Sequence, residues 1–201
     1  MSERANRRAD IAASDLTELL TAAPPDSVEV DGKRYAVYTD FRYGILLSEL
    51  FSDDSVDVYQ KIGLALRLIS PELREAVERG EVPIQTAFDR VMAYYTCGME
   101  TERQGKGRSG EPAFDFSCDG ERILTAFRQV YQLDLTVEHL HWWKFMALLR
   151  GLPPECELMR VIRLRLTDTG KISDDETRRR VRRAKAAVRI RKKTGKETKN
   201  G

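Results

Sequence analysis

The chain of 201 residues is long enough for one large domain or two small ones. It is 41% apolar and 33% charged, and no stretch approaches the ~20 consecutive apolar residues that span a bilayer. The polar N-terminus MSERANRRAD lacks the apolar centre of a secretory signal, and Cys97, Cys118 and Cys156 are far apart, which suits reduced thiols. We therefore expect a cytoplasmic protein without a membrane span or a disulfide framework.

The net charge of +2 hides an asymmetric distribution. Residues 178–201 hold twelve Lys or Arg and one acid, so they carry +11 and leave −9 for residues 1–177. An acidic body with a basic tail can bind an acidic partner or nucleic acid, or can fold its tail back on itself. Charge alone leaves all three open.

The first half of the chain predicts one hairpin among helices. Residues 1–13 are expected to be disordered, and SDLTELLTAA reads as a short helix that begins at the N-cap Ser14 and stops at Pro24-Pro25. VEVDGKRYAVYTD alternates apolar and polar residues around Asp31-Gly32, which predicts a β-hairpin because both turn positions tolerate positive φ.

Helical spacing then follows over four segments. They run from a cap at Asp40 to about Glu49, from 56 to 69, from Pro71 to Gly80, and from 84 to 95. With the hairpin, these segments form a predicted N-terminal helical subdomain over residues 14–98.

The second half predicts further helices. Residues 99–113 are rich in Gly and charge and lack periodicity, so we expect a flexible linker. A C-terminal helical subdomain over 114–193 follows, and 194–201 form a disordered tail. Its first helix is predicted to be capped by Asp119, its third to run near 155–166, and its last to begin at SDDE with Ser173 and Glu176 as a capping box. The predicted fold is mainly α, a multi-helix bundle-like protein with one N-terminal β-hairpin and a basic C-terminal helix.

The sequence offers little chemistry. His139 and His141 would point about 200° apart on a helix, and no cysteine lies at ligand spacing, so we expect no metal site. DFSCDGERILTA resembles a calcium loop, but its twelfth position is Ala126, and a helix cap explains it better. Without a phosphate loop, a nucleophile elbow or a convincing acid–base pair, we expect no catalytic residues and no cofactor.

The segment HLHWWKFMALLRGL contains both tryptophans. On a helical wheel Trp142 lies on a broad apolar face, and His141 lies within that face as a buried or half-buried imidazole with one hydrogen-bond partner. Trp143 lies off that face, near Arg150, on the side where exposure is expected. Because neighbouring tryptophans cannot both face one core, either another element covers Trp143 or a partner does. The basic C-terminal helix is the favoured cover.

That C-terminal helix has a narrow apolar seam. Val181, Ala184 and Val188, with the aliphatic stem of Arg191, can dock on another helix of this chain or of a partner. Docking is favoured over nucleic-acid binding, because no aromatic residues interleave with the basic ones for base stacking.

The motifs together resemble a known family. FDFSCDGERILTAFRQVYQLDLT and HLHWWKFMALLRGL, with YTDFR at 38–42 and MRVIRLR at 159–165, are similar to the bacteriophage Gp-fifteen family over roughly Leu16 to Ile190. The resemblance implies a tail-morphogenesis component of long-tailed phages, encoded between the tail tube and tape measure genes, where tail assembly chaperones usually lie. It implies no catalytic residues, and no role transfers to residues 99–113 or to the basic extension.

We therefore expect a non-enzymatic tail assembly chaperone in the host cytoplasm. Its expected partner is the tape measure protein, with the tail tube protein and further copies of this chain as additional candidates. A nucleic-acid-binding protein that uses the basic helix is the alternative, and an enzyme is third. The candidate partner-binding residues are Phe127, Tyr131, Trp142, Trp143, Phe145 and Arg150.

Overall fold

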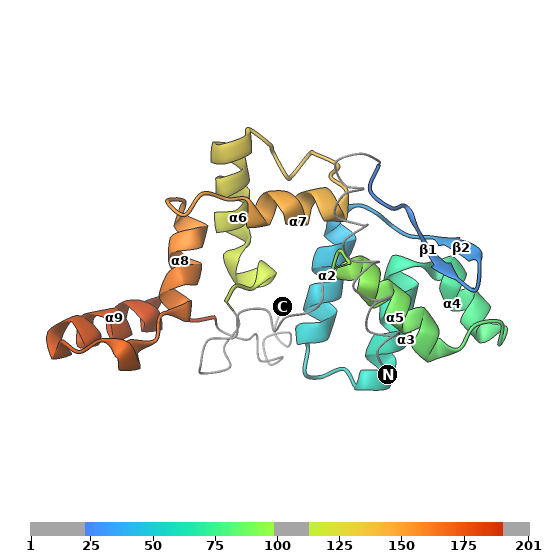
Figure 1. The fold of residues 1–201 in the computed structure, drawn as a ribbon, viewed down its shortest axis with the longest axis horizontal. Helices are drawn as coiled ribbons and strands as arrows, with labels where there is room; N and C mark the ends of the chain where they lie inside the picture. Colours follow the sequence, from blue (N-terminus) through green and yellow to red (C-terminus); the bar gives the residue numbers. More distant parts are fainter. Residues whose placement is uncertain (1–22, 99–112, 191–201) are drawn as a thin grey trace, which may run out of the picture. The chain divides into compact units, whose positions relative to one another are not determined.

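A computed structural model describes residues 23–98 and 113–190 (Figure 1). Within these ranges the chain forms eight α-helices and one two-stranded antiparallel sheet, which confirms the predicted mainly α class with a hairpin. No helix in the described ranges is long and apolar enough to cross a membrane. The predicted helix near Ser14 and nearly all of the predicted linker lie outside the described residues.

The hairpin forms where its turn signal predicts. Strands β1 (Ser27–Val30) and β2 (Lys33–Ala36) pair with Val30 opposite Lys33. Asp31 and Gly32 have φ of 49° and 77°, the positive values that a two-residue turn requires. The hydroxyl of buried Ser70 donates to the Ala36 carbonyl at 2.6 Å, so the hairpin is held against the helices that follow.

Four helices and the hairpin belong to the first of two compact units, which comprises residues 1–101 and 139–148. The helices are α2 (Phe41–Ser52), α3 (Val58–Ile69), α4 (Pro71–Glu78) and α5 (Ile84–Tyr95). Asp40 caps α2 as predicted, while α3 begins two residues later than expected because Asp57 accepts hydrogen bonds from the first-turn amides. The core of this unit includes Tyr35, Phe41, Leu47, Leu66, Ile69, Leu73, Val91 and Phe145.

The second unit comprises residues 102–138 and 149–201. Its elements are α6 (Phe116–Tyr131), α8 (Glu157–Leu166), the 3₁₀ turn η1 (Thr169–Lys171) and α9 (Asp175–Ala187). Helix α7 (Trp142–Arg150) begins in the first unit, and its residues up to Leu148 group with that unit. The predicted subdomain over 114–193 had placed them with the later helices. The reason for the difference is packing, because Trp142 and Phe145 are buried among aromatic rings of α2 and α5.

Two predicted caps are wrong. Helix α6 is capped by Asp115, whose side chain accepts from the Cys118 amide, and Asp119 lies inside the helix, fully buried. Helix α9 is capped by Asp174, in place of Ser173. Both segments hold several capping side chains close together, so the choice depends on what else each side chain can bind.

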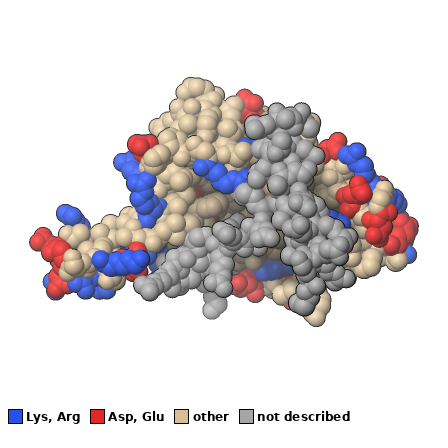
Figure 2. Space-filling view, viewed as in Figure 1, with Lys and Arg blue, Asp and Glu red and all other residues tan. Residues whose placement is uncertain are grey.

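Helix α9 is the most polar element described. None of its residues is buried, and Figure 2 shows Lys and Arg side chains, with some acids, over the part of the surface that α9 occupies. Of its predicted seam, Val181 and Val188 are half-buried and Ala184 is exposed, while Arg191 lies outside the described residues. The helix contacts α8 and η1, so the seam docks in part within its own unit.

Candidate functional site

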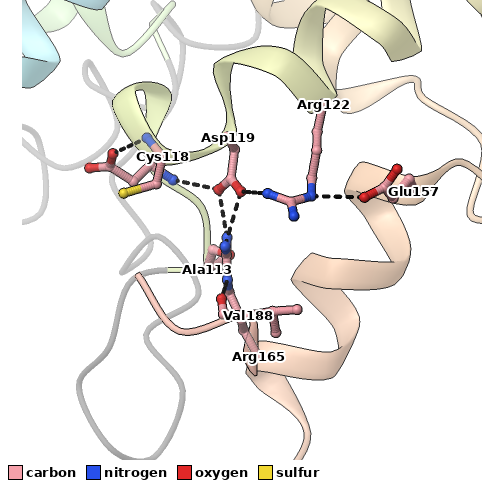
Figure 3. A network of polar contacts seen from close by, with 8 residues as sticks. Ala113, Cys118, Asp119, Arg122, Glu157, Arg165 and Val188 are labelled. Carbon is pink, nitrogen blue, oxygen red and sulfur yellow. Dashed lines mark hydrogen bonds and ion pairs between the residues drawn. The ribbon is translucent and has the colours of Figure 1, made fainter. Parts of the chain in front are cut away.

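A buried ion pair joins α6 and α8 in the second unit (Figure 3). Asp119 of α6 is fully buried, and Arg165 of α8 is 6% exposed. The guanidinium holds both carboxylate oxygens, with Nη1 at 2.5 Å from Oδ2 and Nη2 at 3.0 Å from Oδ1. This bidentate geometry is the strongest arrangement available to an arginine and a carboxylate.

Two further donors complete the shell around Asp119. Arg122 donates from Nη1 to Oδ1 at 3.2 Å, and the Asp115 amide donates to Oδ2 at 3.1 Å. Each oxygen thus accepts two hydrogen bonds, which fills the usual capacity of a carboxylate. Arg122 also donates from Nε to Glu157 at 3.0 Å, at the start of α8. Because its lone pairs are occupied, Asp119 is suited to hold the fold and not to take a proton from a substrate.

Arg165 also joins segments that are distant in sequence. Its Nε donates to the Val188 carbonyl at 2.6 Å, and its Nη1 donates to the Ala113 carbonyl at 3.3 Å. Ala113 precedes α6, and Val188 is the C-cap of α9. One side chain of α8 therefore fixes the end of α9 and the chain before α6, and we call this network the Arg165 clasp.

The first unit holds both tryptophans. The Trp142 indole donates to the Tyr95 carbonyl at 2.8 Å, and the Trp143 indole donates to the Tyr94 carbonyl at 2.9 Å. These carbonyls lie in the last turn of α5, where a helix leaves acceptors without an intrahelical partner. Two consecutive indoles therefore cap the carboxyl end of one helix.

This arrangement corrects the expectation for Trp143. The side chain is 5% exposed, and its ring lies 6.2 Å from that of Tyr94 between centroids. The element that covers it is α5, in place of the expected C-terminal helix. Both tryptophans are buried because they occupy the first turn of α7, where the end of α5 reaches both indoles.

Trp142 also requires a glycine on α2. A Cβ atom built on Gly44 would lie 2.2 Å from Cε3 of the Trp142 ring, far inside contact distance. The indole also stacks on Tyr95 at 5.2 Å and 8° between planes. The ring is thus packed against both the α2 backbone and an α5 side chain.

We predict that Gly44→Ala lowers the free energy of unfolding by about 1–3 kcal/mol, through overpacking against the indole. Gly63→Ala on α3 is the matched control, because its new methyl group would meet nothing within 4 Å. The control should raise stability by about 0.5–1 kcal/mol through helix propensity alone. Urea unfolding followed by circular dichroism measures the free energies of unfolding of both variants. Equal stability of the two variants would contradict the close packing of Trp142 on Gly44.

Both histidines form hydrogen bonds within the fold. Exposed His139 lies with Nδ1 3.0 Å from Oδ2 of Asp40, the cap of α2. Half-buried His141 accepts from the Trp143 amide at Nδ1, so its Nε2 carries the proton and donates to the Pro25 carbonyl at 3.0 Å. Burial lowers the pKa of His141, which favours this neutral form. In the described part of the chain, no group of three or more His, Cys, Asp or Glu could hold a metal ion.

Two motifs that are far apart in sequence, around Asp40 and around His141, pair with each other. Asp40 and His141 form an antiparallel bridge, the Trp142 amide donates to the Thr39 carbonyl at 2.7 Å, and the Phe41 amide donates to Leu140 at 2.9 Å. YTDFR and HLHWW therefore lie side by side. Their pairing fixes the first residues of α2 and of α7.

The exposed apolar side chains lie elsewhere. Val58 and Tyr59, in the first turn of α3, are 68% and 85% exposed. Half-buried Phe51, at the end of α2, contacts the rings of Phe88 and Tyr95 edge-on, and its carbonyl accepts from Lys61 at 3.0 Å. We call the surface formed by Phe51, Asp53, Asp54, Asp57, Val58 and Tyr59 the α2–α3 corner.

Comparison with known proteins decides the family. The family described as Bacteriophage Gp15 protein matches residues 20–190, most of the chain. The chain belongs to this Gp15 family. No curated protein and no solved structure matched the chain. The resemblance of the motifs is thereby confirmed, and the chain is a phage structural or morphogenesis protein.

The Gp15 motifs build the core more than the surface. Four of the six candidate partner-binding side chains, Phe127, Trp142, Trp143 and Phe145, are buried in their units. Tyr131 is half-buried and Arg150 is exposed. Direct contact with a partner by the four buried side chains would require the fold to open. The sequence analysis did not single out the α2–α3 corner, although the apolar pair Val58-Tyr59 follows a short segment that contains three aspartates, which was a readable signal.

Proposed function

We propose that this Gp15-family protein is a non-enzymatic tail assembly chaperone that binds the tape measure protein in the host cytoplasm. Membership of the family carries the proposal, because it limits the chain to phage structure or morphogenesis. The chemistry supports a binding role, since Asp119, the most buried acid among the described residues, has both carboxylate oxygens engaged in hydrogen bonds.

The α2–α3 corner is the surface we assign to this partner. A tape measure protein is long and helical, and its apolar seams stay unburied until the tail tube grows around it. A chaperone must offer exposed apolar side chains beside charges that keep the complex in solution. Tyr59 and Val58 provide the apolar part, and Asp53, Asp54 and Asp57 provide an acidic border. Weak contacts repeated by several copies suit a chaperone that must leave as tube subunits arrive.

Co-expression with the tape measure protein of the same phage tests the function. We expect the soluble yield of the tape measure protein to rise, and a complex with several copies of this chain to elute. If the tape measure protein stays equally insoluble with and without this chain, and no complex elutes, the chaperone proposal fails.

The double substitution Val58→Ser with Tyr59→Ser tests the surface. Losing two exposed anchors should weaken the complex about tenfold or more, because central apolar side chains of an interface contribute about 1–2 kcal/mol each. Val137→Ser is a matched control, since Val137 is 68% exposed, as Val58 is, and lies in the other unit. All variants should fold normally. Equal binding by the double variant and the control would place the contact surface elsewhere.

A further inference from the structure

Helix α9 has two unlike faces. The half-buried residues recur at helical spacing on the side toward α8 and η1: they are Thr177, Arg178, Val181, Lys185 and Val188. At 100° per residue, four exposed arginines spread over about 160° of the opposite side. They are Arg179, Arg180, Arg182 and Arg183, and we call them the arginine face.

The fold does not use the arginine face to hold α9. The helix is fastened by Arg165 to the Val188 carbonyl and by Lys185 to the Thr167 carbonyl at 3.0 Å. Arg178 contacts only the start of its own helix, at Asp175 and the Ser173 carbonyl. Within the described residues, none of the four outer arginines makes an ion pair or a side-chain hydrogen bond. All four arginines are exposed, and Arg180 has a coulombic interaction with Asp174 at the start of the helix, so the four charges can reach a partner.

The composition of this face indicates what that partner is. A protein partner would need apolar or aromatic anchors at the centre of the contact, and apart from arginine this side offers only the acids Asp175 and Glu176 in its first turn and the alanines 186 and 187. All four cations are arginines, whose planar fork matches phosphate oxygens in two hydrogen bonds. The absence of aromatic side chains from α9 removes the stacking on which single-strand binding depends.

We propose that the arginine face binds the phosphate backbone of duplex DNA without reading its sequence. Arg180 and Arg182 point to opposite sides of the helix, so α9 lying in or along a groove about 12 Å wide can reach phosphates on both walls. Residues 1–177 carry −9 and repel phosphate. Binding is thus confined to the C-terminal end. This property is separate from the proposed chaperone function, which uses the α2–α3 corner.

The test uses the full chain and a fluorescein-labelled duplex of random sequence, titrated by anisotropy between about 50 and 200 mM NaCl. A quadruple variant replaces Arg179, Arg180, Arg182 and Arg183 with Gln. Its matched control replaces Arg67, Arg90, Arg128 and Lys144 with Gln, which removes four exposed cations away from α9. Glutamine keeps helix propensity close to that of arginine, so both variants should retain the helical spectrum of the parent.

The intact chain should bind the duplex with an affinity that falls steeply with salt. The α9 variant should bind at least about tenfold more weakly at low salt, and its slope of log affinity against log salt should be smaller by about 2–4, near 0.9 for each lost phosphate contact. The control should keep the parent slope. Absence of binding by the intact chain, or equal losses in the two variants, would overturn the proposal. Equal competition by polyglutamate and by duplex at the same charge would also overturn it, because the face would then select acidic polypeptide.

Discussion

Arg165→Met should lower the free energy of unfolding by about 3–5 kcal/mol, one of the two largest effects we expect in this chain. The substitution leaves the Asp119 carboxylate fully buried, with only Arg122 and the Asp115 amide as donors. It also removes the donor to the Ala113 and Val188 carbonyls. A buried charge that loses its main partner must either be desolvated alone or take up a proton, and both are unfavourable.

Arg163→Met on the same helix is the control, because Arg163 is exposed and should change stability by less than about 0.5 kcal/mol. Urea unfolding followed by circular dichroism gives the free energies, and hydrogen exchange should show faster exchange at the end of α9. The double variant Asp119→Leu with Arg165→Met should be more stable than Arg165→Met alone, since it removes both charges. A change below about 1 kcal/mol in Arg165→Met would contradict the Arg165 clasp.

The Arg165 clasp also explains why the cap of α6 could not be predicted from the sequence. Local signals were sufficient for the turn at Asp31-Gly32 and for the cap at Asp40, because these features involve only a few adjacent residues. Asp115 and Asp119 are both plausible caps by local criteria. What separates them is Arg165, which lies 46 residues after Asp119 in the sequence. No spacing rule shows that pairing.

The burial of Trp143 was not predicted, for a related reason. A helical wheel assigns one buried side to one helix, so it places Trp143 off the apolar face that contains Trp142. In the structure, α7 begins at Trp142, and the residues before it pair with Thr39 and Phe41. The end of α5 then reaches both indoles. The wheel described the helix correctly and could not describe the neighbouring helix that buries its other side.

Trp143→Ala should lower the free energy of unfolding by about 3–5 kcal/mol, the usual range for truncation of a buried large aromatic side chain. The variant loses the packing against Tyr94 and leaves the Tyr94 carbonyl without its indole donor. Trp143→Phe should have an intermediate effect, because it keeps a ring and loses only the N–H group and part of the volume. Chemical unfolding followed by circular dichroism measures this series.

Tyr94→Phe tests the buried hydroxyl alone, because it keeps both the ring and the carbonyl that contact Trp143. The Tyr94 hydroxyl is buried and has no hydrogen-bond partner, and burial raises the pKa of this phenol, so removing the oxygen should leave stability unchanged or slightly higher. The carbonyl that accepts from Trp143 is unaffected.

If Trp143→Ala is as stable as the parent, the indole is not part of the core. If it is destabilised but binds the tape measure protein in proportion to its folded fraction, Trp143 supports the fold and the partner surface lies among exposed residues such as Tyr59.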